Sequence, residues 1–93
     1  MKTVTILIGN SDNKLAQDVW KDFCNDVHTS SENWSREIHF SAPSVGWADW
    51  QNACWVMLVE DFNVPQLRER MIELRKRYRQ NSLAFVVGDT EFI

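Results

Sequence analysis

Residues 3–8 read Thr-Val-Thr-Ile-Leu-Ile, and the turn-forming residues Gly-Asn-Ser-Asp-Asn follow directly at positions 9–13. β-Branched and apolar residues on both faces are typical of an interior strand. Asn, Ser and Asp are preferred helix N-caps, so a helix is expected to follow the strand. Apolar residues recur every four positions over residues 14–28, which predicts that this helix runs from Lys14 to His28.

The rest of the chain completes the order β-α-β-β-α-β. The predicted segments are a polar loop at 29–33, an alternating edge strand at 36–42, a connection at 43–52, an apolar central strand at 53–59, an amphipathic helix from Pro65 to near Gln80, and a strand at 83–87. This order predicts one α+β domain over residues 1–93, of the ferredoxin-like split-βαβ type. Its sheet would be antiparallel and four-stranded, with both helices on one face. The alternative is another α+β sandwich in which the tail adds a fifth strand.

Length and composition limit the class of protein. The 93 residues are 44% hydrophobic and 25% charged, which is typical of a single globular domain. The two cysteines form no C-x-x-C motif, so a reducing compartment is expected. No signal peptide is recognised, and no apolar run approaches the roughly 20 residues that span a bilayer. A bacterial or other cytoplasm, without membrane attachment, is therefore the predicted location.

Charge is distributed unevenly along the chain. The net charge is −3, but residues 65–79 carry six basic and two acidic side chains, and the remainder carries four basic and eleven acidic ones. An acidic body repels a phosphate backbone at long range, so general nucleic-acid binding is not expected. A local site for a small anion remains open.

The predicted topology brings three polar connections to one end of the sheet. The first starts a helix, where an anion is favoured by free backbone N–H groups. The second holds two tryptophans that can stack on a base, and the third holds arginines suited to phosphate or carboxylate. The candidate ligand-binding residues are Asn10, Ser11, Asp12, Lys14, Trp47, Trp50, Arg75, Arg79 and Gln80. Each segment also has a structural interpretation: a turn with its N-cap, tryptophans folded over the sheet end, and cations at their own helix C-terminus.

Catalytic and metal-binding signatures are missing. His28 and His39 lack ligand spacing with a cysteine or with each other, so no metal or other cofactor is predicted. The glycine-rich phosphate loops and the nucleophile-elbow motif are absent as well. We therefore expect a binding protein and not an enzyme; a small nucleotide-processing enzyme is the least favoured alternative.

Four stretches, at residues 9–15, 50–55, 77–82 and 91–92, together resemble small, largely uncharacterised proteins of phages and other mobile elements. The resemblance implies an accessory, anti-defence role in a bacterial host cytoplasm. On this view the protein would sequester a nucleotide signal. Alternatively it would inhibit a host defence protein. The contact would be the acidic helix face, with Asp18, Asp22 and Asp26 mimicking nucleic acid, or the loop that holds the two tryptophans. A homodimer formed through the exposed edge strand is a further expectation.

Overall fold

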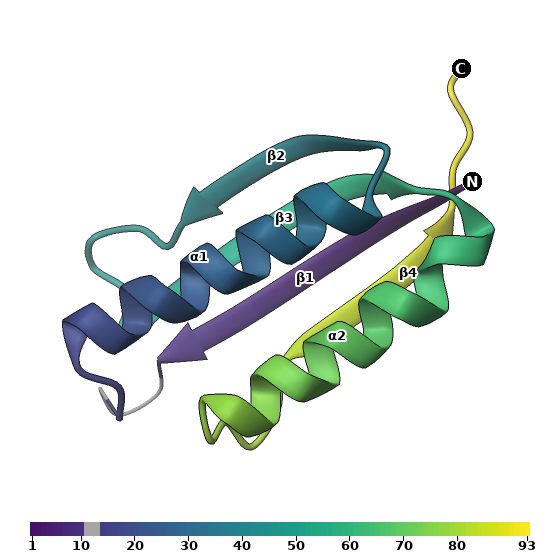
Figure 1. The fold of residues 1–93 in the computed structure, drawn as a ribbon. Helices are drawn as coiled ribbons and strands as arrows, with labels where there is room; N and C mark the ends of the chain where they lie inside the picture. The colour runs from purple at the N-terminus through teal and green to yellow at the C-terminus, as the bar shows by residue number, and fades with distance from the viewer. Residues whose placement is uncertain (11–13) are drawn as a thin grey trace.

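The computed structural model describes residues 1–10 and 14–93. Its elements are β1 (Lys2–Asn10), α1 (Gln17–Trp34), β2 (Glu37–Pro43), β3 (Gln51–Val59), the short 3₁₀ helix η2 (Asp61–Asn63), α2 (Val64–Arg77) and β4 (Ala84–Asp89). The strands form one antiparallel sheet in the order β2-β3-β1-β4. Both helices lie on the same side of that sheet (Figure 1). The predicted ferredoxin-like α+β fold is confirmed.

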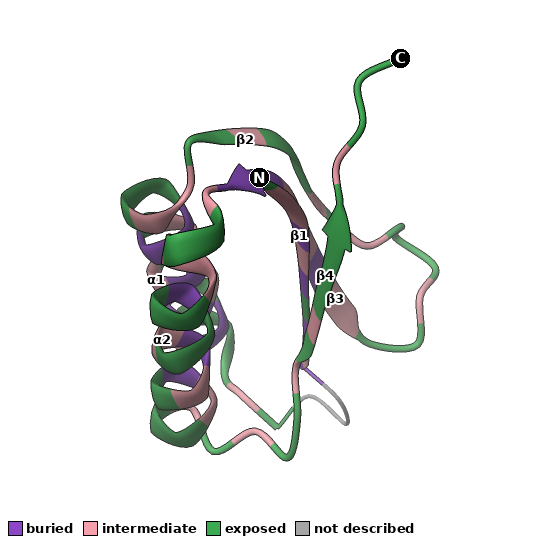
Figure 2. Ribbon diagram, turned by 90° about the vertical axis from the view of Figure 1, so that its right-hand side faces the viewer, coloured by how far each residue is buried: buried purple, intermediate pink, exposed green. Residues whose placement is uncertain are grey.

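The core lies between the helices and one face of the sheet (Figure 2). Alternate residues of the two central strands point towards the helices, and apolar residues at intervals of three or four point back. The residues at its centre are Val4, Ile6, Ile8, Phe23, Val27, Met57, Leu67, Met71 and Leu74, each at most 1% exposed. This packing leaves the opposite face of the sheet without a covering layer.

The predicted loop at residues 29–33 is wrong, because α1 continues through it to Trp34. Ser30 and Ser31 are buried inside the helix although serine is a weak helix former. The Ser31 hydroxyl donates to the carbonyl of Val27 at 2.8 Å, and the Ser30 hydroxyl accepts from Arg70 of α2 at 3.1 Å. The bond from Arg70 to Ser30 and the bond within α1 from Ser31 thus offset the low helix propensity.

The start of α1 also differs from the prediction. The helix begins at Gln17 with Ala16 as its N-cap, not at Lys14 behind a cap within residues 9–13. Gly9 and Asn10 belong to β1, whose pairing with β3 extends to Asn10↔Gln51. Within the described residues, the N-cap of α1 is Ala16, which forms no side-chain capping hydrogen bond.

Smaller differences affect the other boundaries. β3 begins at Gln51, two residues earlier than expected, and α2 ends at Arg77 instead of near Gln80. Residues 90–93 form no strand, so the fifth strand of the alternative fold is not seen. Within the described residues, no helix is both long enough and apolar enough to cross a membrane.

Candidate functional site

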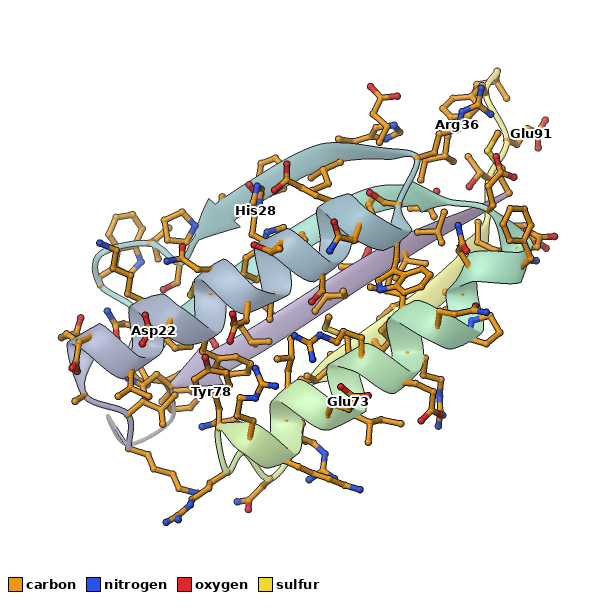
Figure 3. All side chains as sticks on the ribbon, in the orientation of Figure 1. Asp22, His28, Arg36, Glu73, Tyr78 and Glu91 are labelled. Atoms are coloured by element: carbon orange, nitrogen blue, oxygen red, sulfur yellow. The ribbon has the colours of Figure 1, made fainter. Side chains whose placement is uncertain are left out.

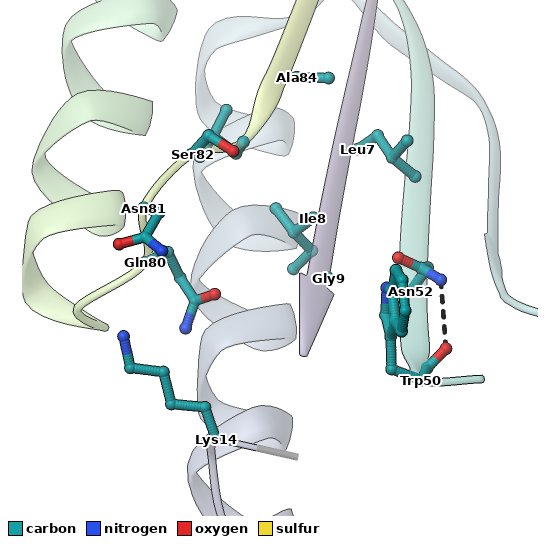
Figure 4. A pocket seen from close by; sticks show the side chains of 11 residues that line it. Leu7, Ile8, Gly9, Lys14, Trp50, Asn52, Gln80, Asn81, Ser82 and Ala84 are labelled. Carbon is teal, nitrogen blue, oxygen red and sulfur yellow. Dashed lines mark hydrogen bonds between the residues drawn. The ribbon is translucent and has the colours of Figure 1, made fainter. Parts of the chain in front are cut away.

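The three connections meet at one end of the sheet, opposite the two chain termini (Figure 1). A pocket of about 300 Å³ lies there, around the end of β1. Lys14, Gln80 and Asn81 lie on one side of β1, and Trp50 and Asn52 lie on the other (Figure 4). The polar and aromatic lining consists of Lys14, Trp50, Asn52, Gln80, Asn81 and Ser82, and no carboxylate belongs to the described lining.

Gly9 lets the Trp50 side of the pocket approach β1 closely. A Cβ atom at this position would lie 2.8 Å from Oδ1 of Asn52 and 3.6 Å from Nε1 of Trp50. The Asn52 amide nitrogen donates to the Trp50 carbonyl at 3.2 Å, which orients this side chain. Trp50 remains 42% exposed, so its ring is supported by the strand and still accessible to a ligand.

The opposite side of the pocket is held by the end of α2. The Gln80 N–H donates to the carbonyl of Arg75 at 2.9 Å, and the Arg79 N–H donates to that of Lys76 at 3.1 Å, which is a Schellman motif. Arg79 adopts the left-handed conformation at φ 54°. Nζ of Lys14 donates to the Arg79 carbonyl at 2.6 Å. This bond uses one of the three ammonium donors, so two remain for a ligand.

Arg79→Gly is expected to stabilise the protein by about 0.5–1 kcal/mol, because the left-handed conformation is costly for arginine and accessible to glycine. The midpoint and slope of urea unfolding measure the change. Lys76→Gly is the control: it lies inside α2, where glycine costs about 1 kcal/mol. Destabilisation by Arg79→Gly would contradict the assigned backbone conformation.

Asn10 has a structural role, because its side chain holds the backbone of Leu15. Its side chain is completely buried. Oδ1 accepts from the Leu15 N–H at 2.8 Å, and Nδ2 donates to the Leu15 carbonyl and to Gln51 Oε1. The amide therefore closes the first connection and is not offered to a ligand. Ser11 and Asp12 lie outside the described residues.

Three other candidates, Trp47, Arg75 and Arg79, do not line the pocket. Trp47 is 85% exposed and does not contribute to the lining. Arg75 donates from Nη1 to the Gln80 carbonyl at 3.2 Å and lines a neighbouring groove beside Asn81 and Ser82. The structure thus brings together Lys14, Trp50 and Gln80 in the pocket, and only the backbone carbonyl of Arg79 contacts Lys14.

Tyr78 fixes the position of the third connection. It lies between the helices (Figure 3), where its ring stacks on Phe23 with centroids 4.6 Å apart. Its hydroxyl donates to Asp26 at 2.5 Å, and Arg77 lies 3.5 Å from the same carboxylate oxygen. Burial, followed by this hydrogen bond, raises the pKa of Tyr78 to about 12.

The raised pKa of Tyr78 predicts a loss of stability in alkali. The folded protein keeps the phenol proton up to about pH 12, and the unfolded chain releases it near the ordinary value of 10.0. The free energy of unfolding should therefore fall as the pH rises from 10 to 12. Urea unfolding at several pH values should show a smaller fall for Tyr78→Phe than for the wild type. Equal falls in both proteins would contradict this role of Tyr78.

The described His, Cys, Asp and Glu side chains form no metal centre, and the Cys24 thiol is not activated. Within residues 1–10 and 14–93, no set of three His, Cys, Asp or Glu side chains is arranged to hold a metal ion. Cys24 and Cys54 are unpaired and partly buried. Burial raises the pKa of Cys24 to about 11, so this thiol is protonated and weakly nucleophilic at neutral pH.

No protein-family model and no curated protein matches the sequence. Several solved structures are similar in fold. A dimeric ferredoxin-like protein of unknown function from Thermobifida fusca has a TM-score of 0.64 at 8% identity, covering 97% of this chain and 92% of that one. A putative PII-like signalling protein from Thermus thermophilus has a TM-score of 0.52 at 15% identity, with coverages of 94% and 82%.

A hydroxynitrile lyase from Passiflora edulis is also similar, with a TM-score of 0.59, 9% identity and coverages of 99% and 97%. One of these proteins is described as a signalling protein and one as an enzyme. At such identities the similarity concerns the backbone only, and the chain has the ferredoxin-like fold.

Proposed function

We propose that this protein binds a small anionic, nucleotide-like ligand in the pocket at the end of β1 and leaves it chemically unchanged. The observation that carries the proposal is the composition of the lining. One lysine, one accessible tryptophan, three carboxamides and a serine surround about 300 Å³, without an acidic side chain among the described lining residues. Pockets of this size hold small ligands.

Each side of the pocket has a part in this binding. The Trp50 ring stacks on the base, as aromatic side chains do in sequence-tolerant nucleotide binding. Lys14 contributes its two remaining donors to the phosphate. The carboxamides of Asn52, Gln80 and Asn81 both donate and accept, which suits the mixed edge of a base.

The biological role that we propose is that of a phage-type accessory protein which sequesters a nucleotide signal of host defence. The sequence resemblance to mobile-element proteins supports this role. One solved structure with the same fold is described as a signalling protein, so a role in signalling has a precedent on this backbone.

The alternative role, inhibition of a host protein through an acidic helix face, has less support. Asp26 is engaged with the Tyr78 hydroxyl and lies 3.5 Å from Arg77. The Asp18 carboxylate accepts from the N–H of Val19 at 2.9 Å. The three aspartates therefore do not form a uniform, unpaired acidic surface.

A thermal-shift screen against mono-, di- and cyclic nucleotides tests the proposal. A nucleotide at 100 times its dissociation constant stabilises by about 2.7 kcal/mol, which raises the midpoint of a domain this small by roughly 10–20 °C. Lys14→Met should reduce the shift, and Lys76→Met, on an exposed lysine outside the pocket, should not. No shift with any nucleotide, or equal shifts in both variants, would contradict the proposal.

A further inference from the structure

The face of the sheet that the helices leave open carries two uncharged rows of side chains. The strand register aligns Phe40, Val56, Thr5 and Val86 in one row and Ala42, Cys54, Leu7 and Ala84 in the next. The Thr5 hydroxyl and the Cys54 thiol are the only polar side-chain groups among these eight residues. The rows cross all four strands, so they form one continuous apolar surface.

Much of this surface is accessible to solvent. Phe40, Leu7 and Val86 are 54%, 43% and 57% exposed. Both helices lie on the other side of the sheet, and the edge-on view shows this face without a second layer (Figure 2). Soluble monomers rarely expose a contiguous apolar patch of this kind unless it binds a partner.

We propose that a second copy of this chain covers the open face, so that two sheets pack face to face around a twofold axis. This surface suits a copy of itself because it has no charge that would need an opposite charge across the interface. A nucleic-acid partner would need basic residues and stacking aromatics here. Trp55 of β3 is buried on the helix side and donates to Nδ1 of His28, so it is not offered on this face.

The face is a better interface than the edge strand expected from the sequence. β2 carries a register shift between Ile38 and Phe40, and it ends at Pro43, which has no N–H to donate. Both features oppose the addition of a further strand. The pairing of two β2 edges is therefore disfavoured.

The footprint of the open face is about half the accessible area that a specific interface buries per partner. Four strands about 4.8 Å apart and about seven residues long at about 3.4 Å per residue give a footprint of roughly 450 Å². Specific interfaces bury about 800 Å² of accessible surface per partner, and protruding side chains expose more area than their footprint. The tail adds Phe92, which is 72% exposed and lies 6.5 Å from His39 between ring centroids, and Ile93, which is completely exposed.

Dimerisation would also change the pocket, a point that rests on the proposed function. Leu7 and Ala84 belong both to the second apolar row and to the pocket lining. A sheet laid on the face therefore covers the side of the pocket that these two residues form. Burial of that side would exclude water from the bound ligand and strengthen its contacts with Lys14.

The oligomeric state of the full chain tests the proposal without any ligand. Sedimentation at micromolar to millimolar concentration should show a dimer for the wild type. Phe40 and Val86 lie on the face but outside the pocket lining. Phe40→Lys and Val86→Lys should each sediment as a monomer, and circular dichroism should show that each variant is folded. Phe62→Lys is the matched control, because Phe62 is 71% exposed on η2, away from the face, and should leave the dimer intact.

A monomeric wild type throughout this range, or variants that remain dimeric, would overturn the proposed interface. The nucleotide screen then separates this inference from the proposed function. A dimer that binds no nucleotide leaves the interface standing and removes the function. Equal nucleotide affinity in the wild-type dimer and in monomeric Val86→Lys would overturn the claim that the second copy completes the pocket.

Discussion

Trp50→Ala is expected to weaken nucleotide binding by about 1–3 kcal/mol, or roughly 5- to 150-fold, because stacking on an aromatic ring contributes that much per base. Trp50 lines the pocket, and its indole lies beside Gly9 at the end of β1. Alanine removes the ring and leaves the hairpin bond between the Ser44 N–H and the Asn52 carbonyl, at 2.8 Å, in place. Isothermal titration calorimetry with the nucleotide selected in the screen measures the difference.

Trp47→Ala provides the matched control for this experiment. Trp47 is in the same connection and carries the same side chain, but it is 85% exposed and does not line the pocket. Its removal should change the affinity by less than about twofold, since surface substitutions usually alter free energies by within 0.5 kcal/mol. If Trp47→Ala weakens binding and Trp50→Ala does not, the ligand lies elsewhere on this connection.

Phe23→Ala should give the largest change in stability, a loss of about 3–5 kcal/mol. Phe23 is 1% exposed and lies at the centre of the core between the helices and the sheet. Its ring stacks on Tyr78 at 4.6 Å and meets the edge of Trp20 at 6.1 Å, so alanine leaves a cavity and removes two aromatic contacts. Urea unfolding followed by circular dichroism measures the loss.

Phe62→Ala is the control for the core substitution. The Phe62 side chain is 71% exposed, so its removal should change the free energy of unfolding by less than about 0.5 kcal/mol. A loss below about 1.5 kcal/mol for Phe23→Ala would mean that the helices pack on the sheet differently from the arrangement described above. The same result would also weaken the assigned position of Tyr78 and of the pocket wall that follows it.

The fold was predictable because its main signals are local. Alternation in the edge strand, continuous apolar strands at the centre and apolar repeats in the helices each follow from the sequence. The end of α1 was not predictable in this way. Ser30 and Ser31 resemble loop residues in isolation, and their helical state depends on Arg70 and on burial against α2. The predicted start of α1 was also wrong. The side-chain amide of Asn10 forms hydrogen bonds with the backbone of Leu15 instead of capping a helix.

The meeting of three connections followed from topology, but the individual pocket residues did not. Trp47 and Trp50 are equivalent in the sequence, and only the packing of Trp50 against Gly9 distinguishes them. Asn52, Asn81 and Ser82 line the pocket but were missed because they belong to no distinctive motif. The strand register could have indicated Asn52, since it pairs with Gly9. The residues on the exposed face of the sheet could also have been predicted. Successive strand residues point to opposite faces, so those that do not face the helices lie on the open face.

Nucleotide titration followed by ¹H–¹⁵N correlation spectra tests the central claim most directly, because it locates the ligand on the chain. The proposed site predicts the largest shifts at the Trp50 indole N–H, at Lys14 and at residues 80–84, all of which line the pocket. Residues at the far end of the fold, such as Asp61 and Phe62 of η2, should stay unchanged. Shifts concentrated on the exposed face of α1 or on η2, or spectra that no nucleotide changes, would contradict the claim that this pocket is a nucleotide site.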